Sequence, residues 1–365
     1  MPAASILIAM LVSWIVSFLT IGQLIKIGHK YRLLDMPGRH KRHKRPVPIV
    51  GGLALFAAVW ITVLVSSRLF PDFALEPAGS ILYIFLGALI IVAVGLADDL
   101  CPLSAWIKLA AQVSVGLLLY LAGLRVELLT TPFGSIEIGA ASAVITVLWV
   151  VGLSNAVNLI DGLDGLAAGV SLIAALTMLA IGHLHGVGWV LVFIYALIGF
   201  LSVFLLYNRY PARIFLGDSG SMQIGYYFAV FSLIVPLKSF TASALYVPLL
   251  VLGVPILEAL SSLTRRLIKG RSVMKADRRH LFHLLALAGF SRRQVVLVFY
   301  ALGVVFGLFA LAMYFWNRIL VLAFLVVFMV VILTLFFILV AGLSHRRRNG
   351  GISTEKAAGH GRRQV

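Results

Sequence analysis

Residues 79–99 read GSILYIFLGALIIVAVGLADD, an apolar run that ends in two adjacent aspartates. A run of about 20 apolar residues is long enough for one α-helix to cross the hydrocarbon core of a membrane. Similar runs recur along the whole chain, separated by shorter polar or charged segments. We therefore predict about 11 transmembrane helices, at 4–27, 49–70, 79–97, 104–124, 139–157, 163–182, 187–206, 219–236, 241–262, 294–315 and 319–343.

The composition supports a membrane protein. Of the 365 residues, 61% are hydrophobic and 12% are charged, and the mean hydropathy is +1.06. Soluble enzymes, disordered proteins and secreted disulfide-rich domains are excluded, because they need a more polar composition. β-barrels are excluded because their strands read as short alternating segments. The predicted fold is an all-α polytopic membrane protein, with one transmembrane catalytic domain at 1–343 and a basic, disordered tail at 344–365.

The distribution of basic residues predicts the orientation of the chain. The net charge is +17, from 30 Lys and Arg against 13 Asp and Glu. With the N-terminus outside, all basic residues except Arg68, Arg125, Lys238 and Arg318 fall on the inner side of the predicted spans. Basic residues are retained on the cytoplasmic side, so the C-terminus is predicted to be cytoplasmic. The positive charge then indicates contact with membrane lipids and no nucleic acid.

One outer segment differs from the others. Residues 125–138 read RVELLTTPFGSIEI, with short alternating apolar runs around a Pro and a Gly. This pattern predicts a small β-hairpin on the outer, periplasmic face.

Acidic residues gather at the inner ends of separate predicted spans. Asp98 and Asp99 follow one span, Asp218 precedes another, and the segment 155–166 reads NAVNLIDGLDGL. The last segment places Asn155, Asn158, Asp161 and Asp164 at intervals of three, with glycines that favour a turn. Carboxylates at several span ends on one side of the membrane indicate a single convergent site.

Such a cluster needs a counter-charge, because partly desolvated carboxylates repel one another. Asp and Asn oxygens without a His or Cys cluster favour a hard cation, which is Mg²⁺ or alternatively Mn²⁺. A metal of this kind binds substrate phosphates together with a few protein oxygens. The sequence therefore predicts phosphate chemistry at this site.

Two basic loops on the same side provide candidate phosphate ligands. Residues 275–285 read KADRRHLFHLL, in which Arg278, Arg279, His280 and His283 could hold a diphosphate. Residues 35–52 read DMPGRHKRHKRPVPIVGG, which combines basic residues with Pro and Gly. Retention of positive charge at the cytoplasmic face is the alternative explanation for the basic residues of both loops.

Together these segments resemble the polyprenyl-phosphate N-acetylhexosamine-1-phosphate transferase family of glycosyltransferases. The resemblance runs from Asp35 to His283. Its most specific parts are the Asn-x-x-Asn-x-x-Asp-Gly-x-Asp-Gly-Leu run at 155–166 and the segment from Asn208 to Ser221. The supporting matches are Asp35, Pro37, Lys41, His43, Pro48, Gly51, Gly52, Asp98, Asp99, Leu103, Ser104, Asp277, His280 and His283.

The resemblance implies transfer of a sugar-1-phosphate from a UDP-N-acetylhexosamine to undecaprenyl phosphate, with release of UMP. It implies ten or eleven spans in a bacterial inner membrane, a site on the cytoplasmic face and a role in starting a cell-envelope glycan. Cell-wall polymers and the O-antigen of lipopolysaccharide are examples of such glycans. A homodimer is one option for the assembly.

The resemblance also implies residue roles. Asn158 and Asp218 would bind Mg²⁺, and Asp98 and Asp99 would be catalytic, with either one as the base. His280 and His283 would lie near the diphosphate and are assigned as catalytic. The expected substrate-binding residues are Lys41, His43, Asn155, Asp161, Asp164, Arg213, Arg278 and Arg279.

Three positions depart from the family pattern. Phe282 stands where a histidine is frequent, Pro102 stands where an acid is frequent, and His40 replaces an arginine. The histidine difference favours a simple UDP-N-acetylhexosamine over the larger muramoyl-pentapeptide donor. Two alternative functions are a transporter of a phosphorylated or lipid-linked solute, and a catalytically altered relative of the family.

Overall fold

The computed structural model describes residues 3–37, 45–69, 78–131, 134–185, 188–234, 246–268, 270, 280–332 and 334. Four predicted site residues, Lys41, His43, Arg278 and Arg279, lie outside the described residues, as does the predicted tail at 344–365.

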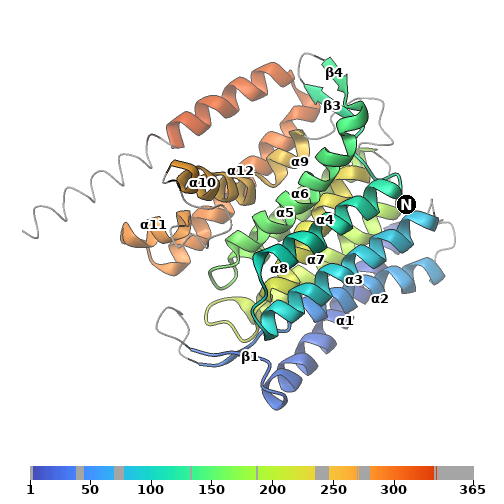
Figure 1. Ribbon diagram of the computed structural model, residues 1–365, viewed down its shortest axis with the longest axis vertical. Coiled ribbons are helices and arrows are strands. Elements are labelled where there is room, and N and C mark those ends of the chain that lie inside the picture. The colour runs from blue at the N-terminus through green and yellow to red at the C-terminus, as the bar shows by residue number, and fades with distance from the viewer. Residues whose placement is uncertain are drawn as a thin grey trace, which may run out of the picture.

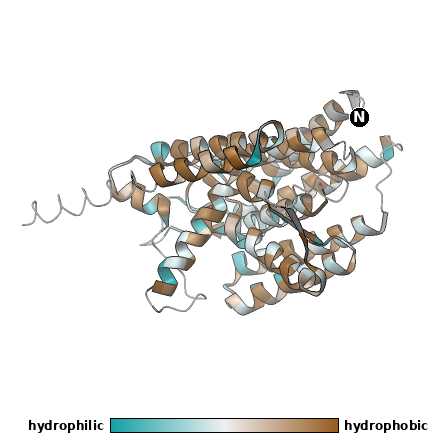
Figure 2. Cartoon of the chain, turned by 90° about the horizontal axis from the view of Figure 1, so that it is seen from above, coloured by the Kyte–Doolittle hydropathy of each residue, from teal (hydrophilic) through white to brown (hydrophobic). Residues whose placement is uncertain are grey.

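The described chain consists mainly of helices, and seven of them are long and apolar enough to cross a membrane. Most residues along the helices are hydrophobic (Figure 2), as expected where lipid surrounds the bundle. The prediction of an all-α membrane protein is confirmed, and the number of spans stays a prediction. The labelled helices are α1 Ala3–Lys30, α2 Gly51–Leu69, α3 Ala78–Leu100, α4 Ala105–Leu121, α5 Ser142–Ile160, α6 Leu166–His185, α7 Gly188–Asn208, α8 Gly217–Ile234, α9 Tyr246–Val251, α10 Gly253–Ile268, α11 Leu281–Leu287 and α12 Arg292–Phe315. A further apolar helix, Arg318–Ile332, follows α12.

The helix α8 passes through the centre of the bundle. It packs against α3, α5 and α2 (Figure 1). Every residue of α8 is buried except Asp218, which lies in its first turn. The sequence of α8 is rich in Gly and Ser at this end, and small side chains let neighbouring helix backbones approach closely. The only acid of α8 is therefore placed where the helix leaves the protein interior.

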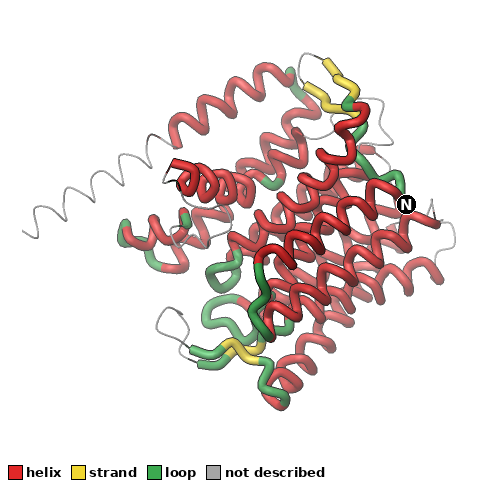
Figure 3. Tube along the Cα trace, in the orientation of Figure 1, coloured by secondary structure: helices red, strands yellow, loops and turns green. Residues whose placement is uncertain are grey.

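Two short antiparallel sheets mark opposite ends of the bundle (Figure 3). At one end, β1 (Leu34–Asp35) pairs with β2 (Val47–Pro48). At the other end, β3 (Leu128–Thr131) pairs with β4 (Gly134–Glu137) inside the segment where we predicted a hairpin. A 3₁₀ turn at Gly139–Ala141 connects this sheet to α5.

The prediction of one continuous span at 241–262 is wrong for its described part. Helix α9 ends at Val251, Leu252 lies in a turn, and α10 begins at Gly253. Pro255 has no backbone N–H to bond the carbonyl four residues earlier, so an unbroken helix is disfavoured here. The break directs α10 to a position between α5 and α12.

Candidate active site

The end of α3 is joined to the start of α8 by the side chain of Asp99. Its Oδ1 accepts a hydrogen bond from the Asp218 backbone N–H at 2.8 Å. Its Oδ2 accepts from the Ser219 N–H at 3.1 Å and from the Ser219 hydroxyl at 2.7 Å. A carboxylate at a helix N-terminus satisfies backbone donors that have no partner within the helix. Both oxygens of Asp99 therefore hold the first turn of α8 in place.

Asp98 and Asp218 are bridged by Lys108, which lies in the first turn of α4. The Lys108 Nζ is 2.9 Å from Asp98 Oδ2 and 2.9 Å from Asp218 Oδ2. The other oxygen of Asp98 accepts the Leu103 N–H at 2.7 Å. The three side chains are 16–25% exposed, so the ion pairs lie at the edge of the protein interior. Two acids from separate helices thus share one cation.

The end of α5 contributes the two asparagines. Asn158 Oδ1 accepts a hydrogen bond at 2.9 Å from Ser221, whose hydroxyl also donates to the Gly217 carbonyl. This places Asn158 beside the first turn of α8, close to Asp218. Asn155 donates to Gln112 Oε1 at 2.6 Å, which connects α5 to α4. Asn158 is therefore at the acidic cluster, whereas Asn155 binds a neighbouring helix.

Helix α5 ends at Ile160 and the chain turns through residues 161–165 before α6 begins, as the glycines predicted. Asp164 Oδ2 accepts the Ala212 N–H at 3.0 Å, and Asn208 Oδ1 accepts the Gly165 N–H at 2.9 Å. These bonds fasten the turn to the end of α7 and to the loop after it. The segments that matched the family are thus neighbours in space.

Asp161 lies in this turn, outside the membrane-spanning helices. Burial, together with the nearby carboxylates of Asp218, Asp99 and Asp164, raises the pKa of Asp161 to about 8. The cluster therefore holds more acidic groups than Lys108 can neutralise, an arrangement that favours binding of a further cation.

The carboxylate and amide oxygens of the acidic cluster are the kind of ligand that a hard divalent cation prefers. Within the described residues, no group of three or more His, Cys, Asp or Glu side chains is arranged to hold a metal ion. The expected pair is the carboxylate of Asp218 and the amide oxygen of Asn158. A metal held by so few protein oxygens completes its shell with water and substrate phosphates, as Mg²⁺ does.

The histidine segment is held by a buried acid, Glu258 of α10, whose side chain is 0% exposed. His280 Nδ1 is 3.0 Å from Glu258 Oε1, and the Leu281 N–H donates to both carboxylate oxygens. A hydrogen bond at one ring nitrogen of a histidine fixes the direction of the other. Glu258 therefore positions His280 and the start of α11.

Phe282 is 2% exposed and connects this segment to the turn after α5. Its ring stacks on His280 with a centroid distance of 5.2 Å, and its centroid is 4.4 Å from that of His283. A Cβ at Gly162 would collide with the Phe282 ring, so the glycine is needed for this approach. Phe282, which stands where a histidine is frequent in the family, is therefore a buried packing residue in this chain.

We expect Glu258→Gln to lower kcat by about tenfold, because outer-shell partners that orient an active-site histidine commonly have effects of this size. The measurement is steady-state turnover of the purified protein at saturating substrates. Glu127→Gln is the matched control, since Glu127 is exposed and pairs with Arg125 at the other end of the bundle. An unchanged kcat in Glu258→Gln would contradict the positioning role.

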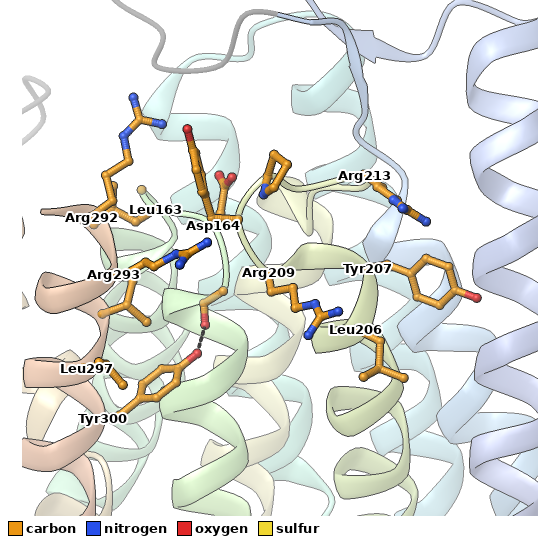
Figure 4. A pocket seen from close by; sticks show the side chains of 15 residues that line it. Leu163, Asp164, Leu206, Tyr207, Arg209, Arg213, Arg292, Arg293, Leu297 and Tyr300 are labelled. Carbon is orange, nitrogen blue, oxygen red and sulfur yellow. Dashed lines mark hydrogen bonds between the residues drawn. The ribbon is translucent and has the colours of Figure 1, made fainter.

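A cavity of about 750 Å³ opens beside the 162–165 turn (Figure 4). It is lined by that turn, by the end of α7 and the loop after it, and by the start of α12. Arg213, predicted from the sequence to bind substrate, is one of its lining residues. Asp98, Lys108, Asn158 and Asp218 are not among them. Arg213 is thus placed at the cavity and not at the acidic cluster.

Sequence reasoning missed several residues of this region. Lys108 is the only charged residue in the segment 104–124. A single charged residue in an apolar span indicates a functional site, so this residue was recognisable from the sequence. The contacts of Glu258 with the histidine segment depend on the path of α10 and had no local signal. From the sequence, Arg209, Arg292 and Arg293 serve only as evidence that this side of the membrane is cytoplasmic.

Comparison with known proteins identifies the family. Residues 81–236 match the model of glycosyl transferase family 4. A Bacillus subtilis (strain 168) protein named "Probable undecaprenyl-phosphate N-acetylglucosaminyl 1-phosphate transferase" is 36% identical over 337 residues, which is 89% of this chain and 92% of the relative. The undecaprenyl-phosphate alpha-N-acetylglucosaminyl 1-phosphate transferase of Yersinia pestis is 32% identical, over 74% of this chain and 73% of the relative.

A decaprenyl-phosphate N-acetylglucosaminephosphotransferase of Mycobacterium tuberculosis (strain H37Rv) is 33% identical, over 82% of this chain and 80% of the relative. The matched residues 81–236 include the acidic cluster of Asp98, Asp99, Lys108, Asn158 and Asp218. The chain therefore belongs to the polyprenyl-phosphate sugar-1-phosphate transferases of glycosyl transferase family 4.

Proposed function

We propose that the enzyme transfers N-acetylhexosamine-1-phosphate from a UDP-sugar to undecaprenyl phosphate and requires Mg²⁺, with Mn²⁺ as a substitute. N-acetylglucosamine is the proposed sugar, since it is the one in the names of the similar proteins. The product would be the first lipid-linked intermediate of a cell-envelope glycan. The active site would face the cytoplasm from the bacterial inner membrane, where the UDP-sugar is available.

The proposed reaction is a displacement at phosphorus. A phosphate oxygen of the lipid attacks the β-phosphorus of the UDP-sugar and forms a new P–O bond. The bond from the β-phosphorus to the bridging oxygen breaks, and UMP leaves with that oxygen. Phosphoryl transfer of this kind depends mainly on positioning and charge stabilisation.

The observation that carries the proposal is the meeting of α3, α4, α5 and α8 at one acidic cluster. Lys108 would stabilise negative charge near Asp98 and Asp218, as it does in the two ion pairs of 2.9 Å. Asp99 uses both oxygens to hold α8, which favours Asp98 as the carboxylate that receives the acceptor. His280, oriented by Glu258, would contact the diphosphate through its other ring nitrogen.

Asp218 and Asn158 would hold the Mg²⁺ ion in this proposal. The bound ion would neutralise charge on the diphosphate in the transition state. The Asp161 and Asp164 turn would bind the nucleotide, with its shape maintained by the bonds to Ala212 and Asn208.

The test is UMP release by the purified protein with undecaprenyl phosphate, Mg²⁺ and a panel of UDP-sugars. We expect release that requires the lipid and the metal, that is abolished by a chelator and that is greatest with UDP-N-acetylglucosamine. Release without the lipid would contradict the acceptor. No release from a folded protein with any donor would favour the catalytically altered relative, and Phe282→His would then be assayed for recovery.

A further inference from the structure

We propose that the cavity between α7 and α12 binds the phosphate headgroup of an anionic phospholipid from the surrounding leaflet. The cavity is lined by four arginines, Arg209, Arg213, Arg292 and Arg293, against one carboxylate, Asp164. Figure 4 shows Arg292 and Arg293 on the α12 side and Arg209 and Arg213 on the side of α7 and its following loop. Basic pockets between transmembrane helices are typical sites for anionic lipid headgroups.

The arginines that line the cavity outnumber the acidic side chains that line it. Within the part of the chain that the structure describes, no carboxylate forms an ion pair with Arg209 or Arg293. Arg292 lies over the Tyr210 ring at 5.2 Å. Asp164 already accepts the Ala212 N–H through Oδ2. Positive charge on both sides of one cavity favours an anion, and guanidinium groups bind phosphate through paired hydrogen bonds.

The apolar rim indicates that the phosphate belongs to a lipid. Leu206 is 61% exposed and Leu297 is 62% exposed, and both line the cavity. Arg209 follows the end of α7 and Arg293 lies in the first turn of α12, so both leucines are further from this end of the bundle than the arginines. Leu297 is four positions after Arg293, which corresponds to a rise of about 6 Å along the helix. A lipid with its phosphate at the arginines would place its acyl chains against the leucines.

The floor of the cavity connects this site to the active site. Tyr300 donates a hydrogen bond of 2.6 Å to the Gly165 carbonyl, which fastens α12 to the 162–165 turn (Figure 4). Gly162, in the same turn, lies against the Phe282 ring. A lipid bound at the arginines would therefore steady a turn that the proposed function assigns to the nucleotide. The binding itself does not depend on that function.

The experiment is native mass spectrometry of the full-length protein in detergent, titrated with phosphatidylglycerol or with phosphatidylcholine as the neutral comparison. We expect saturable binding of phosphatidylglycerol that is roughly fivefold weaker for each arginine removed in Arg209→Gln and Arg293→Gln. Arg68→Gln is the matched control. Arg68 is an exposed arginine in the last turn of α2 and does not line the cavity. Its phosphatidylglycerol affinity should equal that of the wild type.

Two results would overturn the proposal. One is unchanged phosphatidylglycerol affinity in a folded double variant, Arg209→Gln with Arg293→Gln. If the double variant does not fold, the single variant Arg209→Gln is measured instead, because Arg209 is exposed in a loop. The other is displacement of phosphatidylglycerol by UMP or inorganic phosphate, which would assign the arginines to a soluble phosphate. The measurement needs no donor and no turnover, so its failure is distinguishable from failure of the proposed transferase reaction.

Discussion

Asp218→Asn is expected to lower UMP release by about a hundredfold or more, because a bound divalent cation supplies several kcal/mol of charge stabilisation in phosphoryl transfer. Asp218 is the only residue of α8 that is not buried, and its carboxylate lies 2.9 Å from Lys108. Asparagine keeps the size of the side chain and removes its charge. The loss should therefore fall mainly on kcat, with a matching loss of Mn²⁺ binding in electron paramagnetic resonance titrations.

Glu127→Gln is again the matched control for Asp218→Asn, since it removes one carboxylate at the opposite end of the bundle. It should retain both turnover and Mn²⁺ binding. Turnover of folded Asp218→Asn within twofold of the wild type would eliminate Asp218 as a metal ligand. Loss of turnover with unchanged Mn²⁺ binding would assign Asp218 a role without metal.

Gly95→Val is expected to destabilise the protein by about 3 kcal/mol or more and to abolish activity. A Cβ at Gly95 would overlap the backbone of Ser219, at the point where α3 crosses the start of α8. Separating these helices would also break the hydrogen bonds from Asp218 and Ser219 to Asp99. The measurements are the thermal unfolding temperature in detergent and UMP release.

Gly152→Val controls for the change in helix propensity. Gly152 lies within α5, is exposed, and has nothing within 4 Å of the position of an added Cβ. We expect its unfolding temperature to stay close to that of the wild type. Equal unfolding temperatures for the two variants would show that the α3–α8 contact tolerates a larger side chain.

Much of the secondary structure was predictable because it depends on local apolar runs. The predicted span at 187–206 corresponds to α7 at Gly188–Asn208, and the predicted turn near Gly162 separates α5 from α6. The family was predictable as well, because its motifs are short and local in sequence. The break at Leu252–Gly253 was missed because the apolar composition continues through it, although Pro255 was a signal.

The sequence by itself determined the membrane class, the approximate helices, the family and the gathering of acids at one end of separate spans. Only the tertiary structure decided which of two adjacent aspartates holds α8, since Asp98 and Asp99 have the same chemistry and differ only in direction. It also decided that Lys108 bridges Asp98 and Asp218, and that four arginines surround one cavity. The physical reason is that these contacts join side chains from different helices, whose relative positions depend on the packing of the whole bundle and not on local periodicity.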